Sequence, residues 1–253
     1  MERGATHTSP KVGVVIVEDA DLWGGSLGLW RFYKKRFEHY KEEMLLEPIY
    51  AITEKLPDMN EVKSYRGFII TGSNYSVNDD FDWIKNLINF VKNIMNLQCG
   101  PKLFGICFGH QIIGKALGGK VGRNLIGHDV FGTGTIYVSK YFSETASFRK
   151  CFGERQAFKI MQGHGESVLD VPDDAEVIGW SETCLYEVVL WNNRVISTQG
   201  HPEFTTDVMK HRITPFLREH KILTNEQLTK SLLSFSDIDT ANTAQFVKIF
   251  LTE

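Results

Sequence analysis

The chain has 253 residues, of which 42% are hydrophobic, 23% charged and 12% aromatic. This composition is typical of a globular protein, and it excludes a disordered, collagen-like or coiled-coil chain. The formal net charge of -3 is too balanced for a surface that neutralises a phosphate backbone, so we expect no nucleic-acid partner. Because α/β domains often exceed the usual ~150 residues, we expect one domain over residues 1–253.

The apolar runs of the chain are far shorter than the ~20 residues that a bilayer crossing needs, so we expect no membrane partner. Residues 1–10 are polar and small, unlike a secretory signal peptide. The four cysteines are widely separated and form no CxxC pair, which argues against a disulfide framework and against a zinc site. Together these features predict a protein of the reducing cytoplasm.

The first half of the chain alternates short apolar runs with longer amphipathic segments. This alternation predicts a parallel α/β sheet. The expected strands are residues 12–17, 45–52, 67–71 and 102–106, and the expected helices are residues 29–43, 81–97 and 109–117.

The middle of the chain, residues 121–195, has glycine-punctuated runs that favour antiparallel strands, either in a mixed sheet or in a small β insertion. The expected runs are residues 133–138, 157–162, 177–180 and 186–191. A core strand is expected at residues 195–199 and a helix at residues 205–220, which Pro215 should kink or interrupt. We expect a core of about residues 11–222 and a helical extension over residues 223–253.

The clearest chemical signal is Gly105-Ile106-Cys107-Phe108-Gly109, where a buried strand runs directly into a helix. The small flanking residues allow strand and helix to approach closely, and the strained central residue projects from the turn. Cys107 would stand at a helix N-terminus, where the helix dipole and free N–H groups favour a thiolate. The following N–H, on Phe108, would face an oxyanion on the attacked carbonyl.

A cysteine nucleophile needs a base, and the base needs an orienting group. Gly200-His201-Pro202-Glu203 can supply both, because residues two apart in an extended chain share a face. The predicted order is therefore Cys107 as nucleophile, His201 as base and Glu203 as the acid that orients it. A buried structural cysteine and an exposed His-Pro turn are the alternative interpretations.

Other catalytic or binding motifs are weaker. Residues 24–28 fit the GxSxG formula, but they follow their strand at a distance, so we expect an ordinary glycine-rich loop. The histidines have no metal-binding spacing, and the chain has neither a GxGxxG nor a GxxxxGK[ST] loop. We therefore expect no metal and no cofactor.

These motifs resemble those of the class I glutamine amidotransferase superfamily, whose Cys-His-Glu triad cleaves γ-glutamyl amides. Further matching segments make the chain most similar to the cytosolic γ-glutamyl peptidases. These segments are residues 67–73, 82–84, 105–113, 118–123 and 199–204. The resemblance implies a three-layer, flavodoxin-like α/β sandwich with a mostly parallel central sheet, helices on both faces and a small antiparallel β insertion.

The resemblance also implies roles for individual residues. Gly72 matches the glycine whose N–H completes the oxyanion hole with Phe108, and Gln111 matches a residue that helps bind the glutamyl group. His164 and Gly165 lie in the stretch beside the bound glutamate, although neighbouring residues depart from the usual peptidase pattern. For Arg123 we expect a solvated side chain, with contact to a substrate carboxylate as the alternative.

The predicted function is hydrolysis of the γ-glutamyl bond of glutathione or its conjugates through a γ-glutamyl thioester on Cys107. The expected partner is therefore a small γ-glutamyl molecule. The alternative is a glutaminase subunit that delivers ammonia to a separate synthetase partner. A third possibility, a binding protein that keeps only the fold, has the intact triad against it.

Overall fold

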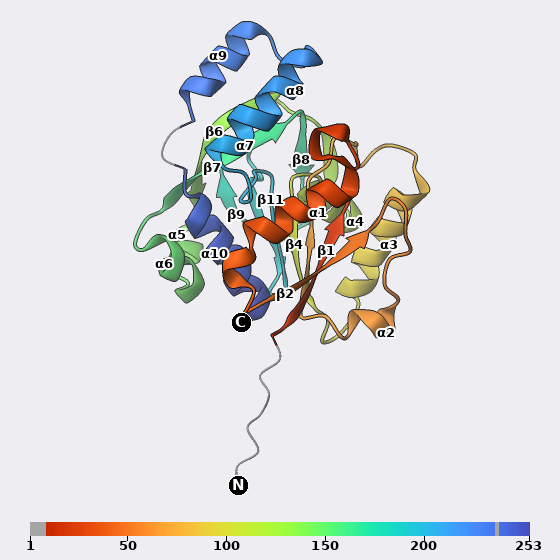
Figure 1. The fold of residues 1–253 in the computed structure, drawn as a ribbon. Helices are drawn as coiled ribbons and strands as arrows, with labels where there is room; N and C mark the ends of the chain where they lie inside the picture. Colours follow the sequence, from red (N-terminus) through yellow and green to blue (C-terminus); the bar gives the residue numbers. More distant parts are fainter. Residues whose placement is uncertain (1–8, 236–237) are drawn as a thin grey trace.

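A computed structural model describes residues 9–235 and 238–253, so the prediction about the first ten residues lies almost entirely outside the described part. Nine strands form one sheet in the order β2-β1-β3-β4-β11-β10-β9-β6-β7 (Figure 1). The first five of these strands are mutually parallel. They are β2 (Leu45–Tyr50), β1 (Lys11–Ile16), β3 (Gly67–Ile70), β4 (Lys102–Ile106) and β11 (Val195–Thr198).

The parallel strands are buried on both faces, which explains their nearly continuous apolar sequences. In β1, Val12 and Val14 face one hydrophobic core, whereas Val15 faces the other. Helices α1 (Gly25–Arg36) and α10 (Thr240–Thr252) cover the first face, and α3 (Asp82–Met95) and α4 (Phe108–Ala116) cover the second. The predicted three-layer α/β architecture is confirmed.

The antiparallel strands extend the same sheet beyond β11. These strands are β10 (Val188–Asn192), β9 (Glu176–Trp180), β6 (Val130–Val138) and β7 (Ala157–His164). A separate two-stranded sheet joins β5 (Lys120–Arg123) to β8 (Glu166–Asp170). A mixed sheet and a small β insertion were the two possibilities for residues 121–195, and the mixed sheet accounts for most of these residues. Neither β5 nor β8 was predicted as a strand; both are short, and β5 has exposed residues at both of its ends.

Helix boundaries differ from the predicted ones where local backbone features decide them. The first helix begins at Gly25, four residues earlier than expected, because Gly24 and Gly25 adopt positive φ angles and turn the chain into it. It ends at Arg36, and a short 3-10 helix (Glu38–Tyr40) follows. Its buried side chains are Leu29 and Tyr33, which lie one helical turn apart.

The predicted helix over residues 205–220 is interrupted, as the proline indicated. It consists of α7 (Thr206–Val208), a π-helical turn (Met209–Ile213) and α8 (Thr214–Glu219), with Pro215 in the first turn of α8. These helices and α9 (Asn225–Leu233) lie at one end of the sheet, above β6 and β7 (Figure 1). The remaining described elements are a 3-10 helix (Asp21–Trp23) and three short α-helices: α2 (Met59–Val62), α5 (Lys140–Ser143) and α6 (Ala146–Phe152).

Two serine side chains, one in α9 and one directly after it, form hydrogen bonds with β6. Ser231 Oγ donates to the Phe131 carbonyl at 2.8 Å, and the Thr133 N–H donates to Ser234 Oγ at 2.9 Å.

In the residues that the structure describes, no helix has both the length and the apolar character needed to cross a bilayer.

The turn between β4 and α4 has the predicted elbow form. Cys107 adopts φ 51° and ψ -101°, a conformation that only glycine adopts without strain. A Cβ on Gly105 would lie 2.5 Å from the Gly109 carbonyl oxygen, and a Cβ on Gly109 would lie 2.2 Å from the Ile70 carbonyl oxygen. The Gly109 N–H also donates to the Thr71 carbonyl at 3.2 Å. The ends of β3 and β4 and the start of α4 are therefore in direct backbone contact.

We predict that Gly109→Ala lowers the free energy of unfolding by about 3 kcal/mol, because the new methyl group overlaps rigid backbone rather than a side chain that can move. Gly163→Ala is the matched control, since its Cβ would meet nothing within 4 Å. Urea denaturation of both variants measures the difference. Equal midpoints would contradict the close approach at the elbow.

We also predict that Cys107→Gly is more stable than Cys107→Ala by about 1 kcal/mol, because glycine relieves the backbone strain that alanine retains. The same two substitutions at Cys151, in helix α6, should give the opposite order because glycine weakens a helix. Denaturation midpoints of the four variants provide the comparison. If alanine is the more stable replacement at both cysteines, the strain at Cys107 is refuted.

Candidate active site

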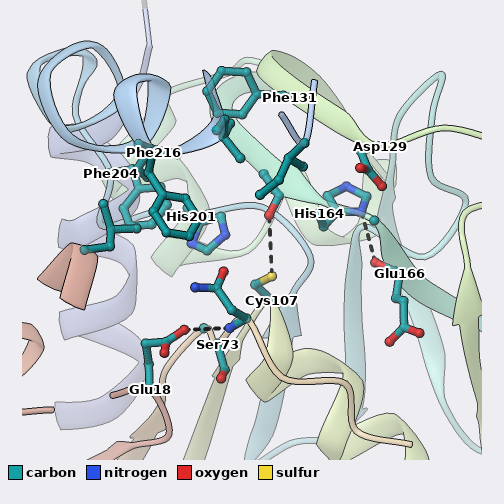
Figure 2. Close-up of a pocket in the computed structure, with 18 of the residues that line it drawn as sticks. Glu18, Ser73, Cys107, Asp129, Phe131, His164, Glu166, His201, Phe204 and Phe216 are labelled. Atoms are coloured by element: carbon teal, nitrogen blue, oxygen red, sulfur yellow. Dashed lines mark hydrogen bonds between the residues drawn. The ribbon is translucent and has the colours of Figure 1, made fainter. Parts of the chain in front are cut away.

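A cavity of about 400 Å³ lies over Cys107, at the carboxyl ends of the parallel strands. Figure 2 shows Phe131, Phe204 and Phe216 on one side of Cys107 and Asp129, His164 and Glu166 on the other. The cavity therefore has an apolar side and a polar side. The apolar residues that line the cavity are Leu22, Trp23, Leu29, Val130, Phe131, Phe204, Ile213, Phe216, Leu217, Ile222 and Leu223.

The structure brings the three predicted catalytic residues together. His201 Nδ1 lies 2.9 Å from Glu203 Oε1, which leaves Nε2 to serve the nucleophile. The His201 N–H donates to the Met161 carbonyl at 2.8 Å, and the imidazole stacks on Phe204 with ring centroids 4.0 Å apart. These contacts fix both the backbone and the ring plane of His201.

Electrostatics favour the protonated form of His201. Burial alone lowers the pKa of His201, but the negative charge of Glu203 and the interactions with Cys107 outweigh it and raise the pKa to about 10. An imidazolium beside the Cys107 sulfur stabilises a thiolate, the nucleophilic form of cysteine. At neutral pH the site therefore holds a proton donor at His201.

Tyr33, which the sequence analysis did not single out, completes the support of Glu203. Its hydroxyl donates to Glu203 Oε1 at 2.9 Å, so this oxygen serves both Tyr33 and His201. Burial and the charge of Glu203 raise the pKa of Tyr33 well above its usual value, which keeps the phenol protonated as a donor. Arg36, one turn further along α1, adds an electrostatic interaction with Glu203.

The two predicted oxyanion donors flank Cys107. Phe108 is the first residue of α4, where a helix leaves its N–H groups without an intrahelical partner. Gly72 follows β3, and a Cβ on it would lie 2.9 Å from His201 Cε1 and 3.5 Å from Cys107 Cβ. Only glycine fits between these two side chains, which brings its backbone next to the reacting sulfur.

The Cys107 sulfur has two polar neighbours. The Gly163 carbonyl lies 3.9 Å from it, and Gln199 Nε2 lies 3.6 Å from it.

Gln111 Nε2 donates to the Glu166 carbonyl at 2.9 Å and to Gln199 Oε1 at 3.3 Å. Since both of its N–H groups have protein acceptors, Gln111 can offer a ligand only its carbonyl oxygen. Gln199, which directly follows β11, falls within the matching segment 199–204, but the sequence analysis assigned it no role.

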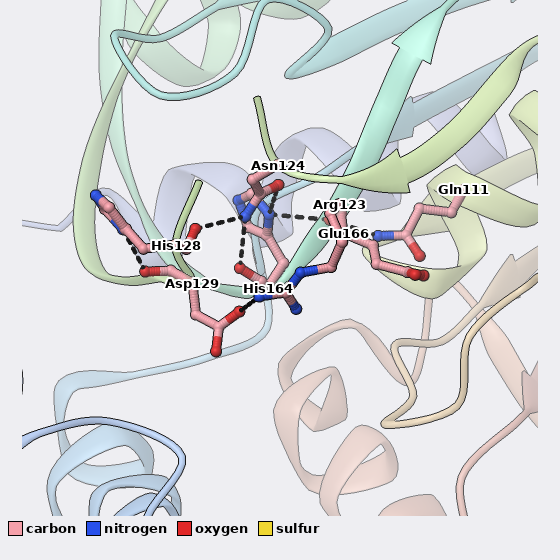
Figure 3. Close-up of polar contacts among 7 residues, drawn as sticks. All are labelled: Gln111, Arg123, Asn124, His128, Asp129, His164 and Glu166. Atoms are coloured by element: carbon pink, nitrogen blue, oxygen red, sulfur yellow. Dashed lines mark hydrogen bonds and ion pairs between the residues drawn. The ribbon is translucent and has the colours of Figure 1, made fainter. Parts of the chain in front are cut away.

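His164 holds the polar side of the cavity in shape (Figure 3). Its Nδ1 lies 3.2 Å from Asn124 Oδ1 and 3.1 Å from the Glu166 carbonyl, and Asn124 Nδ2 donates to the His164 carbonyl at 3.0 Å. Burial lowers the pKa of His164 to about 4, so the ring is neutral at physiological pH. The ring is therefore engaged in shaping the segment around Gly165, which lines the cavity.

Glu18 stabilises the loop that carries Gly72. Its Oε1 accepts from the Asp19 and Ala20 N–H groups, and its Oε2 accepts from the Asn74 N–H at 2.6 Å (Figure 2). Burial raises the pKa of Glu18, although these hydrogen bonds act in the opposite direction. Ser26, the serine of the GxSxG match at residues 24–28, donates to the Glu18 carbonyl at 2.9 Å and lies in the first turn of α1, so the expectation of a glycine-rich loop there is wrong.

No group of three or more His, Cys, Asp or Glu side chains in the described part of the chain is arranged to hold a metal ion.

Comparisons with known proteins identify the family of this chain. The model of the family "Glutamine amidotransferase class-I" matches residues 33–218, more than half of the chain. A Schizosaccharomyces pombe protein named as glutamine amidotransferase-like is 33% identical over 203 residues, which cover 80% of this chain and 74% of that protein. Gamma-glutamyl peptidase 2 of Arabidopsis thaliana is 34% identical over 172 residues, which cover 68% of this chain and 66% of the peptidase.

A solved structure agrees with the same assignment at the level of the fold. The crystal structure of a glutamine amidotransferase from Thermotoga maritima superposes with a TM-score of 0.73 and 18% identity, covering 98% of this chain and 100% of that one. The family model and the relatives together support an enzyme of the hydrolase or amidotransferase type. The chain belongs to the class-I glutamine amidotransferase family.

Proposed function

We propose that the chain is a cysteine-dependent γ-glutamyl peptidase that hydrolyses the γ-glutamyl bond of glutathione or of glutathione conjugates. The observation that carries the proposal is the arrangement of Cys107, His201 and Glu203 at a strained elbow under an open cavity. The similarity to a γ-glutamyl peptidase supports the same substrate class.

The two-sided cavity suits such a substrate. A glutathione conjugate has a charged γ-glutamyl group, and it has an apolar substituent on the sulfur of its leaving peptide. The polar side, with Asp129, His164 and Glu166, can receive the former. The apolar side, with Phe131, Phe204 and Phe216, can receive the latter (Figure 2).

In the proposed first step, the Cys107 thiolate attacks the γ-carbonyl carbon and forms a tetrahedral intermediate. The N–H groups of Gly72 and Phe108 stabilise its oxyanion. As the carbon–nitrogen bond breaks, the His201 imidazolium gives its proton to the leaving amine. The products of this step are a γ-glutamyl thioester on Cys107 and a neutral His201, with Glu203 and Tyr33 holding the imidazole in place.

In the second step, neutral His201 takes a proton from water, and the resulting hydroxide attacks the thioester carbonyl. The carbon–sulfur bond breaks, which releases glutamate and restores the Cys107 thiolate beside the His201 imidazolium. Overall, one water cleaves one γ-glutamyl amide, and no cofactor is required.

We further propose that the protein acts in a reducing, cytoplasmic setting as a single domain. All four cysteines are free in the structure, including the nucleophile that oxidation would inactivate. The other candidate, a glutaminase subunit serving a separate synthetase, shares the triad and the first step, and it differs in the substrate and in its dependence on a partner.

The prediction that separates these functions is the identity of the products. Mass spectrometry after incubation of the isolated chain with glutathione, an S-benzyl glutathione and glutamine should detect glutamate and the matching cysteinylglycine species. Cys107→Ala should lose all turnover, and Cys99→Ala, which changes an exposed thiol, should retain it. Turnover of glutamine alone, or of nothing until a synthetase is added, would favour the glutaminase subunit.

A second prediction concerns pH. Because His201 must carry a proton to release the amine and its pKa is raised to about 10, kcat/KM should persist above neutral pH and fall as the pH rises through that value. Glu203→Gln removes the charge that raises this pKa, so the alkaline limb should move to lower pH.

The pH profile of kcat/KM for the wild-type chain and for Glu203→Gln provides this test. Enzyme that is first held at each pH and then assayed at neutral pH controls for unfolding. An alkaline limb at the same pH in both proteins would remove Glu203 from its electrostatic role.

A further inference from the structure

An ion pair stands at the polar side of the cavity, where β5 ends (Figure 3). Arg123 Nη2 lies 3.0 Å from Asp129 Oδ1. A Cβ on Gly165 would lie 2.5 Å from Arg123 Nη1 and 2.4 Å from Asp129 Oδ1, so the absence of a side chain at Gly165 leaves room for the pair. The guanidinium is thereby held against the segment that runs from Gly163 to Glu166.

Arg123 has a distinctive place among the charges of the cavity. Of the described residues that line the cavity, it is the single arginine or lysine. Four carboxylates line the same space: Glu18, Asp129, Glu166 and Glu203. Without the guanidinium, this surface would repel a substrate carboxylate, and a γ-glutamyl group always carries one on its α-carbon.

The ion pair leaves Arg123 able to accept a ligand. Arg123 has five N–H donors, and its side chain is 67% exposed. Asp129 Oδ1 is buried and, within the described residues, receives no well-aligned hydrogen bond despite the short distance to Arg123. The pair is therefore held by charge, and most guanidinium donors remain available.

We propose that Arg123 binds the α-carboxylate of the γ-glutamyl group that Cys107 attacks, and that Asp129 positions the guanidinium beside Gly165. The inference rests on the proposed function and deepens it, because it names the residue that distinguishes a γ-glutamyl group from an acyl chain without an α-carboxylate.

The test compares γ-glutamyl-p-nitroanilide with 4-aminobutyryl-p-nitroanilide, which lacks only the α-carboxylate. Arg123→Gln should lower kcat/KM for the first substrate by about 10-fold to 100-fold, mainly through KM, since a lost charged hydrogen bond has this effect. The same variant should change kcat/KM for the second substrate by less than about threefold. Arg123→Lys should restore part of the loss, and Asp129→Asn should show a smaller loss with the same substrate dependence.

Lys120→Gln is the matched control, because Lys120 lies on the same strand in an exposed ion pair with Asp170, at 3.0 Å. It should behave as the wild-type chain with both substrates. Equal losses of kcat/KM for both substrates in Arg123→Gln would overturn the inference. A loss with glutathione but none with γ-glutamyl-p-nitroanilide would also overturn it, because that result would place the guanidinium at the leaving peptide. Failure of the wild-type chain to cleave any γ-glutamyl substrate would instead refute the proposed function.

Discussion

The backbone contact among β3, β4 and α4 is the constraint on which the site depends. The Cys107 N–H donates to the Thr198 carbonyl at 2.9 Å, and the Gly109 N–H donates to the Thr71 carbonyl at 3.2 Å. A Cβ on Gly105 or Gly109 would overlap the backbone atoms around these bonds. The two bonds tie the elbow to its neighbouring strands on both sides, and they hold Cys107 in a conformation that its side chain disfavours. The strain thus belongs to a backbone arrangement that also brings Gly72 to the sulfur.

The proposed triad joins parts of the chain that are far apart in sequence. His201 and Glu203 follow β11, Cys107 follows β4, and Tyr33 reaches the same carboxylate from α1. Since β4 and β11 are neighbouring parallel strands, their carboxyl ends bring the thiol and the imidazole to one edge of the sheet. The contact from Tyr33 means that the position of α1 also influences the orientation of His201.

The sequence predicted those features that depend on residues close together along the chain. The elbow could be predicted because glycines at fixed spacing are needed for the turn, and the His201 and Glu203 pair because residues two apart share a face. Tyr33, Asn124 and the Arg123 ion pair could not be predicted, because each depends on a partner brought close only by the folded chain. Strands β5 and β8 have four and five residues and little buried apolar surface, so their sequences carried too weak a pattern.

The serine contacts between α9 and β6 have a consequence for the behaviour of the molecule in solution. Strand β6 pairs with β7 over most of its length but with β9 only at Tyr137 and Val138. The rest of that edge presents backbone groups to which a strand of another molecule could add. Ser231 and Ser234 engage two of these groups, at Phe131 and Thr133. Helix α9 therefore protects an open sheet edge against intermolecular strand pairing, and a chain shortened before this helix would expose a site for aggregation.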